Sequence, residues 1–133
     1  MRHTVNPETM YNSVQFGFSQ AVVQEGGRTV HLAGQVAWNG AGELVGDGDL
    51  AAQTRQVLAN LASVLDAVGA TPANLVRLRT YIVDHDPDKL GIVLGEFPAF
   101  YGDVVPAANT VVGVQALALP GFLVEIEATA VLP

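Results

Sequence analysis

The chain contains no cysteine and only three histidines. The missing cysteines exclude disulfide bonds, thiolate nucleophiles and cysteine-ligated metals. His3, His31 and His85 lie far apart, without the close spacing of a metal-binding motif, so we expect no metal and no other cofactor. The glycines form neither a GxGxxG nor a P-loop pattern, and no serine stands in a GxSxG motif. Nucleotide binding and serine-hydrolase chemistry are therefore not indicated.

Basic side chains are also scarce: the chain has 6 Lys and Arg against 13 Asp and Glu, and its net charge is −7. The basic residues are scattered, so we expect no nucleic acid partner, because the overall field would repel a phosphate backbone. No apolar run is long enough to cross a membrane, and Pro120 and Gly121 interrupt the apolar stretch near the C-terminus. The N-terminus lacks the apolar centre of a signal peptide. We therefore expect a cytoplasmic protein with no membrane partner.

Hydrophobic residues, in contrast, make up 50% of the 133 residues. The length fits one domain, residues 1–133, with a substantial core. The apolar content is high for a small monomer, and contiguous apolar surface usually marks an interface. The composition therefore predicts that copies of the chain associate.

Two helices are expected. The first runs from Asp49 to Val68, where apolar residues recur at three- and four-residue steps behind an aspartate suited to capping. The second begins at Pro87 and continues to Tyr101, with Gly102 behind it. The turn residues and apolar alternation predict these strands: Ser13–Val23, Thr29–Ala37, Glu43–Val45, Val76–Val83, and a final hairpin of residues 106–114 and 124–130 around a turn at Pro120-Gly121.

The resulting βββαβαββ order indicates an α+β fold. We expect a single sheet of about six strands with both helices packed on one face. The helix-free face of the sheet would then be covered by a neighbouring subunit.

The last strand places carboxylates at alternate positions. Glu125, Glu127 and Thr129 share one face, and the apolar residues between them share the other. Two acids on an otherwise apolar strand are costly unless they are paired, solvated or used. Arg77 and Arg79 alternate in the same way on their own strand, so a structural ion pair is the alternative to a chemical role for these acids.

Several local patterns, in this order, resemble the RidA (YjgF, reactive intermediate deaminase) family from about Ser13 to the end of the chain. The patterns are Phe18-Ser19-Gln20-Ala21-Val22, Leu32-Ala33-Gly34-Gln35-Val36, the helix of residues 53–65, the strand of residues 76–84, and residues 106–130. The resemblance implies a chorismate-mutase-like fold and a homotrimer with pockets at the subunit interfaces. It also implies cofactor-free hydrolysis of reactive enamines and imines to 2-keto acids and ammonia.

The polar residues of that family's site match this chain only in part. The carboxylate-binding arginine falls on Asn109, or on Ala108 with a shift of one residue, and no arginine follows Arg79. Apolar residues stand where the family has a tyrosine, a serine, an asparagine and a small thiol-bearing residue; they are Phe18, Ala33, Leu94 and Val111. The resemblance implies that these four, with Gly34, Gln35 and Asn109, bind the substrate, and that Glu125 is catalytic.

A carboxyl group in a partly apolar pocket could position water and transfer a proton, which suits Glu125 to imine hydrolysis. The substrate is expected to be other than a standard 2-imino acid, because a neutral amide at Asn109 replaces the arginine clamp. Two alternatives stay open for single residues: Asn109 could merely finish the turn after Pro106, and Gly34 could simply mark a bulge. The alternative for the whole chain is a trimer that binds a small metabolite without turnover. Endoribonuclease activity, attached to some relatives, is disfavoured by the acidity of the chain.

Overall fold

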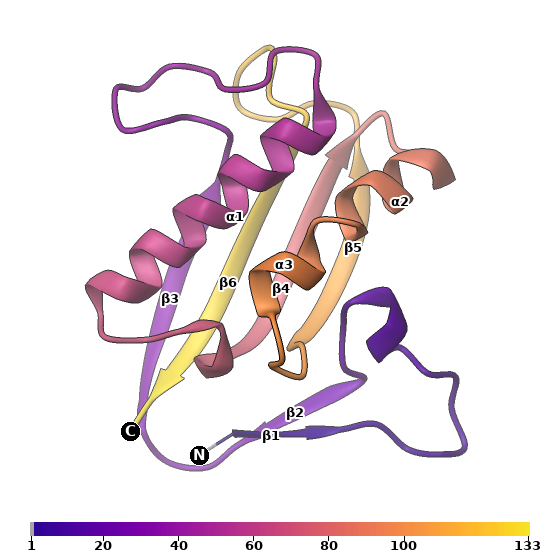
Figure 1. Cartoon of the computed structure of the whole chain (residues 1–133), viewed down its shortest axis with the longest axis vertical. Helices are drawn as coiled ribbons and strands as arrows, with labels where there is room; N and C mark the ends of the chain where they lie inside the picture. The colour runs from indigo at the N-terminus through magenta and orange to yellow at the C-terminus, as the bar shows by residue number, and fades with distance from the viewer. Residues whose placement is uncertain (1) are drawn as a thin grey trace.

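The computed structural model describes residues 2–133, and within that range helices cover one face of a four-stranded sheet (Figure 1). The strands are β1 (Arg2–Val5), β2 (Ala21–Gln24), β3 (Arg28–Gln35), β4 (Leu75–Val83), β5 (Ala108–Val114) and β6 (Val124–Leu132). The helices are α1 (Leu50–Ala67), α2 (Pro87–Leu94) and α3 (Phe97–Tyr101), with 3₁₀ turns at Val14–Phe16 (η1) and Pro72–Asn74 (η2). The α+β class and the placement of the helices on one face are confirmed.

The main sheet has the order β3-β6-β4-β5, which corrects the predicted C-terminal hairpin. β5 pairs in parallel with β4, and β6 pairs antiparallel with both β4 and β3. Residues 115–123 are long enough to pass the end of β4, because an extended chain spans roughly 3.3 Å per residue and strands lie about 4.8 Å apart. The turn at Pro120-Gly121 lies within this crossing and joins strands that are not neighbours.

The N-terminal part of the chain differs most from expectation. Residues 13–23 do not form one strand: η1 follows Ser13, and Gly17 ends it with a φ of +86°, a conformation that glycine adopts without strain. β2 is short and pairs with β1 in a separate two-stranded sheet. The strand predicted at Glu43–Val45 is reduced to an isolated bridge between Trp38 and Leu44.

Helix α1 agrees with prediction. The Asp49 side chain accepts a hydrogen bond from the Ala52 amide at 3.0 Å, which caps the N-terminus. Val57, Leu61 and Leu65 are fully buried against the sheet. Gln53 is buried too. Its side-chain amide donates hydrogen bonds to Gly46 O at 3.1 Å and Gly121 O at 2.8 Å, and it accepts one from the Leu123 backbone amide at 2.9 Å. Helix α1 therefore also holds the connector that leads into β6.

The second predicted helix is interrupted. α2 begins at Pro87 behind the Asp86 cap, as expected, but ends at Leu94, and α3 begins at Phe97. Pro98 explains the break, since its ring would clash with the carbonyl of Leu94 in a continuous helix. Among residues 2–133, no helix has both the length and the apolar character needed to cross a bilayer.

Candidate functional site

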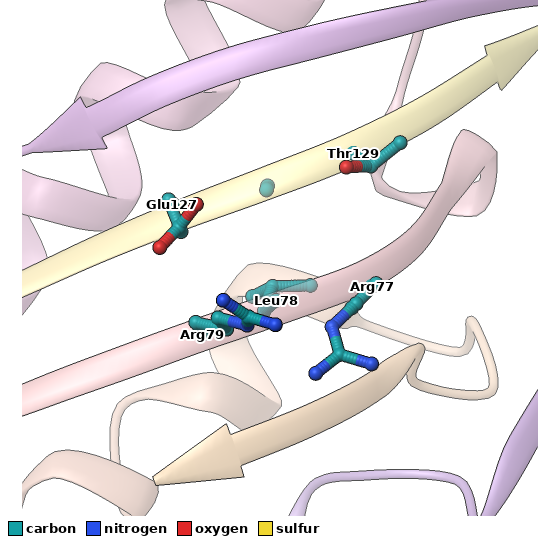
Figure 2. A pocket seen from close by; sticks show the side chains of 6 residues that line it. Arg77, Leu78, Arg79, Glu127 and Thr129 are labelled. Carbon is teal, nitrogen blue, oxygen red and sulfur yellow. The ribbon is translucent and has the colours of Figure 1, made fainter. Parts of the chain in front are cut away.

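The helix-free face of the sheet carries the charged side chains of β4 and β6. Glu125, Glu127 and Thr129 are half-buried there, as the alternation predicts. Their direct partners on β4 are Tyr81, Arg79 and Arg77 in turn, and Figure 2 shows the two arginines beside Glu127 and Thr129. We refer to these six residues as the carboxylate face.

Glu127 bonds to a phenol on the carboxylate face rather than to an arginine. The Tyr81 hydroxyl donates a hydrogen bond of 2.5 Å to Glu127 Oε1. This bond and the charge of Glu127 raise the pKa of Tyr81, with the charge of Arg79 opposing them. Within residues 2–133 the ion pair that forms is Arg55–Glu96, between α1 and the start of α3, at 3.2 Å. The predicted alternative, a structural ion pair that ties Glu125 to Arg77 or Arg79, is therefore not observed.

Glu125 lies directly over the backbone of Gly34. A Cβ atom added at Gly34 would lie 2.4 Å from Glu125 Oε2 and 2.9 Å from its carboxyl carbon. The register between β3 and β6 shifts between Leu32 and Gln35, so Gly34 also lies in a bulge. The glycine thus serves both as a bulge and as the position that lets the carboxyl group of Glu125 approach the backbone.

The surroundings of Glu125 disfavour its ionised form. Partial burial raises the pKa of its carboxyl group, and the negative charge of Glu127 raises it further. The other titratable groups on this face are Tyr81, Arg77 and Arg79 of β4, and His31, which pairs with Thr129 from β3. A carboxyl group with a raised pKa and no ion-pair partner within the described residues is suited to accepting and returning a proton.

The raised pKa of Glu125 makes a prediction for stability. The folded state holds this proton more tightly than the unfolded state, so the contribution of Glu125 to stability is full below the ordinary value of 4.5 and is lost as the pH rises through the higher folded pKa. Glu125→Gln should therefore unfold at a higher denaturant concentration than wild type at neutral pH, and this difference should vanish below pH 4.5. Urea titrations across that range measure it, and a difference that grows toward acid would contradict it.

Four other predicted residues meet elsewhere, in a pocket of about 380 Å³ on the helix-covered side of β5. They are Phe18, Leu94, Asn109 and Val111, joined by three residues that the sequence did not single out: Tyr11, Phe16 and Leu90. We call this the aromatic pocket. Its Tyr11 ring packs at 6.5 Å from that of Phe16 and at 6.4 Å from that of Phe18. In the sequence, the only local sign of this cluster is that three aromatic residues, Tyr11, Phe16 and Phe18, lie within eight residues.

Buried polar side chains hold the loop that carries these rings. Ser19 is buried; its hydroxyl donates to Pro106 O at 2.6 Å and its amide donates to Ala107 O at 3.0 Å. Asn6 Oδ1 accepts one hydrogen bond from the backbone amide of Gln20 at 2.8 Å and another from the buried Ser13 hydroxyl at 3.3 Å. The loop is therefore fastened to the start of β5, immediately before Asn109 (Figure 1).

Asn109 is part of the wall of the aromatic pocket. It lies inside β5 and is paired with Leu78, so the interpretation of Asn109 as the end of a turn is wrong. Its Oδ1 accepts a hydrogen bond of 3.2 Å from the buried Thr80 hydroxyl. Within residues 2–133 its Nδ2 forms no hydrogen bond, and this donor remains for a ligand.

The two remaining predicted residues lie near Gly34. Ala33 is exposed on β3, and the Gln35 side chain donates to its carbonyl at 3.1 Å. Gly34 and Gln35 also border an open groove of about 590 Å³ beside α1. Among residues 2–133, no three side chains of metal-binding type gather in one place.

The residues of the predicted site do not lie together within one copy of the chain. Asn109 pairs with Leu78 on the helix-covered face, whereas Glu125 pairs with Tyr81 on the helix-free face. β5 and β3 are also the opposite edges of the four-stranded sheet. The candidate residues thus form two groups, one at each edge.

Comparison with known proteins identifies the family. A family model described as Endoribonuclease L-PSP matches residues 11–132. A Yersinia pestis protein described as belonging to the conserved Rid family and of unknown function is 63% identical in sequence. It superposes with a TM-score of 0.96 over 98% of each chain. The chain belongs to the RidA (YjgF) family.

Other members of the family are less similar in sequence to this RidA-family chain. A RutC family protein of Pyrococcus horikoshii is 35% identical over 116 residues, which are 85% of each sequence. The 2-iminobutanoate/2-iminopropanoate deaminase of Rattus norvegicus is 34% identical over 86% of this chain and 79% of its own length. The RidA structure from an Antarctic Psychrobacter superposes with a TM-score of 0.69 at 29% identity, covering 86% of this chain and 87% of its own.

Proposed function

We propose that this RidA-family protein is a cofactor-free enamine or imine deaminase that works in clefts between copies of the chain, on substrates other than standard 2-imino acids. The observation that carries the proposal is Glu125. It is half-buried over Gly34, its pKa is raised, and it forms no ion pair within residues 2–133. A relative described as a 2-iminobutanoate/2-iminopropanoate deaminase supports the reaction class.

The position of the two groups supports a site shared between copies. β5 and β3 are the two edges of the sheet (Figure 1). The aromatic pocket lies at the β5 edge, and Gly34 and Glu125 lie toward the β3 edge. If the β5 edge of one copy packs against the helix-free face of the next, the aromatic pocket comes to lie beside Glu125. Such a head-to-tail contact uses two different patches, and it forms a closed ring when the rotation between successive copies closes. On the basis of the family resemblance, we propose that this ring is a homotrimer.

In the proposed reaction, the ionised Glu125 carboxylate accepts a proton from water as the water oxygen bonds to the imine carbon. The π electrons of the C=N bond move to nitrogen, which takes up the proton from Glu125 and returns that side chain to its carboxylate form. Glu125 then helps transfer the remaining proton from oxygen to nitrogen as the C–N bond breaks. The products are a carbonyl compound and ammonia, and the sum is R₂C=NH + H₂O → R₂C=O + NH₃. No redox partner is needed.

Two imines that share one side chain test this function. An amine oxidase acting on phenethylamine releases a neutral imine, and an amino-acid oxidase acting on phenylalanine releases the corresponding imino acid. The protein should accelerate ammonia release from the neutral imine above the spontaneous rate. If it accelerates neither reaction, the protein is not a deaminase for these classes, and ligand binding without turnover would favour the non-catalytic alternative.

The homotrimer is a prediction of its own. The apolar side chain of Val112 on the edge strand β5 is 41% exposed, and it should be covered on assembly. Mass photometry or sedimentation at micromolar concentration should therefore give three times the 13.9 kDa chain mass. A monomer at that concentration would remove the shared cleft.

Activity on small imino acids should be weak. An arginine–carboxylate contact contributes roughly 1.5–3 kcal/mol, and each 1.4 kcal/mol is about a factor of ten. With Asn109 in that place, hydrolysis of 2-aminoacrylate should be about one to two orders of magnitude slower than by an arginine-bearing relative. Ammonia release in parallel assays measures the ratio. Equal rates would mean that Asn109 is no deficit or that another residue binds the carboxylate.

A further inference from the structure

The aromatic pocket has the size and lining of a small-molecule site. Its volume of about 380 Å³ lies within the range of ligand pockets, roughly 300–1,000 Å³. Three rings and three aliphatic side chains form almost all of its surface, and no charged side chain lines it within the described residues. A carboxylate placed here would lose its hydration without gaining a cationic partner.

One polar group interrupts this apolar lining. The Thr80 hydroxyl bonds Asn109 Oδ1 and so fixes the orientation of the amide, whose Nδ2 is left as a donor. A neutral carbonyl or amide oxygen is the natural acceptor for it. The rings of Tyr11, Phe16 and Phe18 already pack in tilted or edge-on pairs, and a further flat ring can join them in the same way.

The rings are held in place before any ligand arrives. Ser13 and Ser19 are each 1% exposed, and their hydrogen bonds fasten the loop to Asn6 and to the start of β5. Phe16 and Tyr11, in contrast, remain 47% and 59% exposed, so their surfaces are available at the mouth of the pocket. A loop that is already fastened loses little backbone freedom on binding.

From these features we infer that the aromatic pocket binds a neutral molecule with one aromatic ring and one carbonyl-type acceptor, and that Phe16 and Asn109 determine this specificity. The inference rests on the proposed function in one respect, because it names the substrate class of the same shared site. The ring lies among Tyr11, Phe16 and Phe18, and the acceptor lies at Asn109 Nδ2. The neutral imine carbon is then left facing the mouth of the pocket.

Phenylacetamide and phenylacetate are suitable probes, because they share a ring and differ in the charge of the head group. Protein-observed NMR titration of the wild-type protein should show phenylacetamide binding at least about tenfold more tightly, with shifts of the Asn109 side-chain amide signals. Asn109→Arg should reverse the preference and tighten phenylacetate binding about 10- to 100-fold. Gln115→Arg adds the same charge at an exposed position just beyond β5 and should not reverse it.

A second pair of variants tests the ring. Phe16→Ala should weaken phenylacetamide binding about two- to tenfold, the range expected for an aromatic pair. Val14→Ala truncates another exposed side chain of η1 that does not line the pocket, and it should leave the affinity within error of wild type. Circular dichroism and the unfolding midpoint confirm that each variant is folded.

Three results would overturn the inference: equal binding of the two probes, an affinity for phenylacetamide that is unchanged by Phe16→Ala, or no binding of phenylacetamide at millimolar concentration. The last would mean that a neighbouring copy fills the pocket. None of these measurements needs turnover. Probe binding without ammonia release would therefore contradict only the deaminase function, and ammonia release without the amide preference would contradict only the substrate class.

Discussion

Glu125→Gln should lower ammonia release from a neutral imine by about 10²–10⁴-fold, the usual contribution of a positioned general acid–base group. Glutamine keeps the shape of the side chain and one acceptor oxygen, but it cannot accept a proton from water. The carboxyl group lies over Gly34 and is held there by the fold rather than by an ion pair among the described residues, so the variant should fold and assemble normally. Initial rates above the spontaneous background, with the oligomeric state checked in parallel, measure the effect.

Glu127→Gln is the matched control. It makes the same change two residues along the same strand and on the same face, where the Tyr81 hydroxyl is the partner. Removing the charge of Glu127 removes one cause of the raised pKa of Glu125, so the pH at which activity rises should move down. Equal losses in the two variants, or full turnover in Glu125→Gln, would show that Glu125 is not the proton-transfer group.

Leu61→Ala should destabilise the protein by about 2–5 kcal/mol, the range for deleting a fully buried leucine side chain. Leu61 is 0% exposed at the centre of α1, in the core cluster that joins this helix to the sheet. The neighbouring strands are regular, so they can collapse only partly into the space left behind. Urea unfolding at fixed protein concentration measures the change, since assembly would make the midpoint depend on concentration.

Leu119→Ala makes the same truncation at a position that is 48% exposed in the connector before β6. It should change the free energy of unfolding by no more than about 0.5 kcal/mol. If Leu61→Ala has as small an effect, the face of α1 is not packed as the structure indicates. Comparing Leu61→Ala with Leu119→Ala thus separates the effect of burial from the effect of shortening a leucine side chain.

The elements with strong local signals were predictable. α1 was recognised because an aspartate cap precedes a long apolar stripe, and the structure has both. The alternation of Glu125, Glu127 and Thr129 against apolar residues depends only on the two-residue period of a strand, and it holds in β6. The break between α2 and α3 could also have been predicted from Pro98, because a proline inside a helix removes a backbone hydrogen bond.

The N-terminal region was not predictable in the same way. The apolar alternation of residues 13–23 resembles a strand, but the bonds from Asn6 and Ser19 fold most of it into a loop. These bonds join residues that are separated in sequence, most of all Ser19 and Pro106, so local sequence patterns cannot predict them. Tyr11 and Phe16 were missed as pocket residues for this reason.

The sequence by itself determined which residues alternate, where the caps and breakers stand, and that the acids of β6 share a face, because these follow from the geometry of one element. Only the tertiary structure decided that β4 lies between β5 and β6, that Glu127 bonds Tyr81 rather than an arginine, and that Asn109 and Glu125 belong to opposite faces. The physical reason is that strand order and side-chain partners depend on contacts between distant segments. Such contacts are settled by the packing of the whole chain and not by any local period.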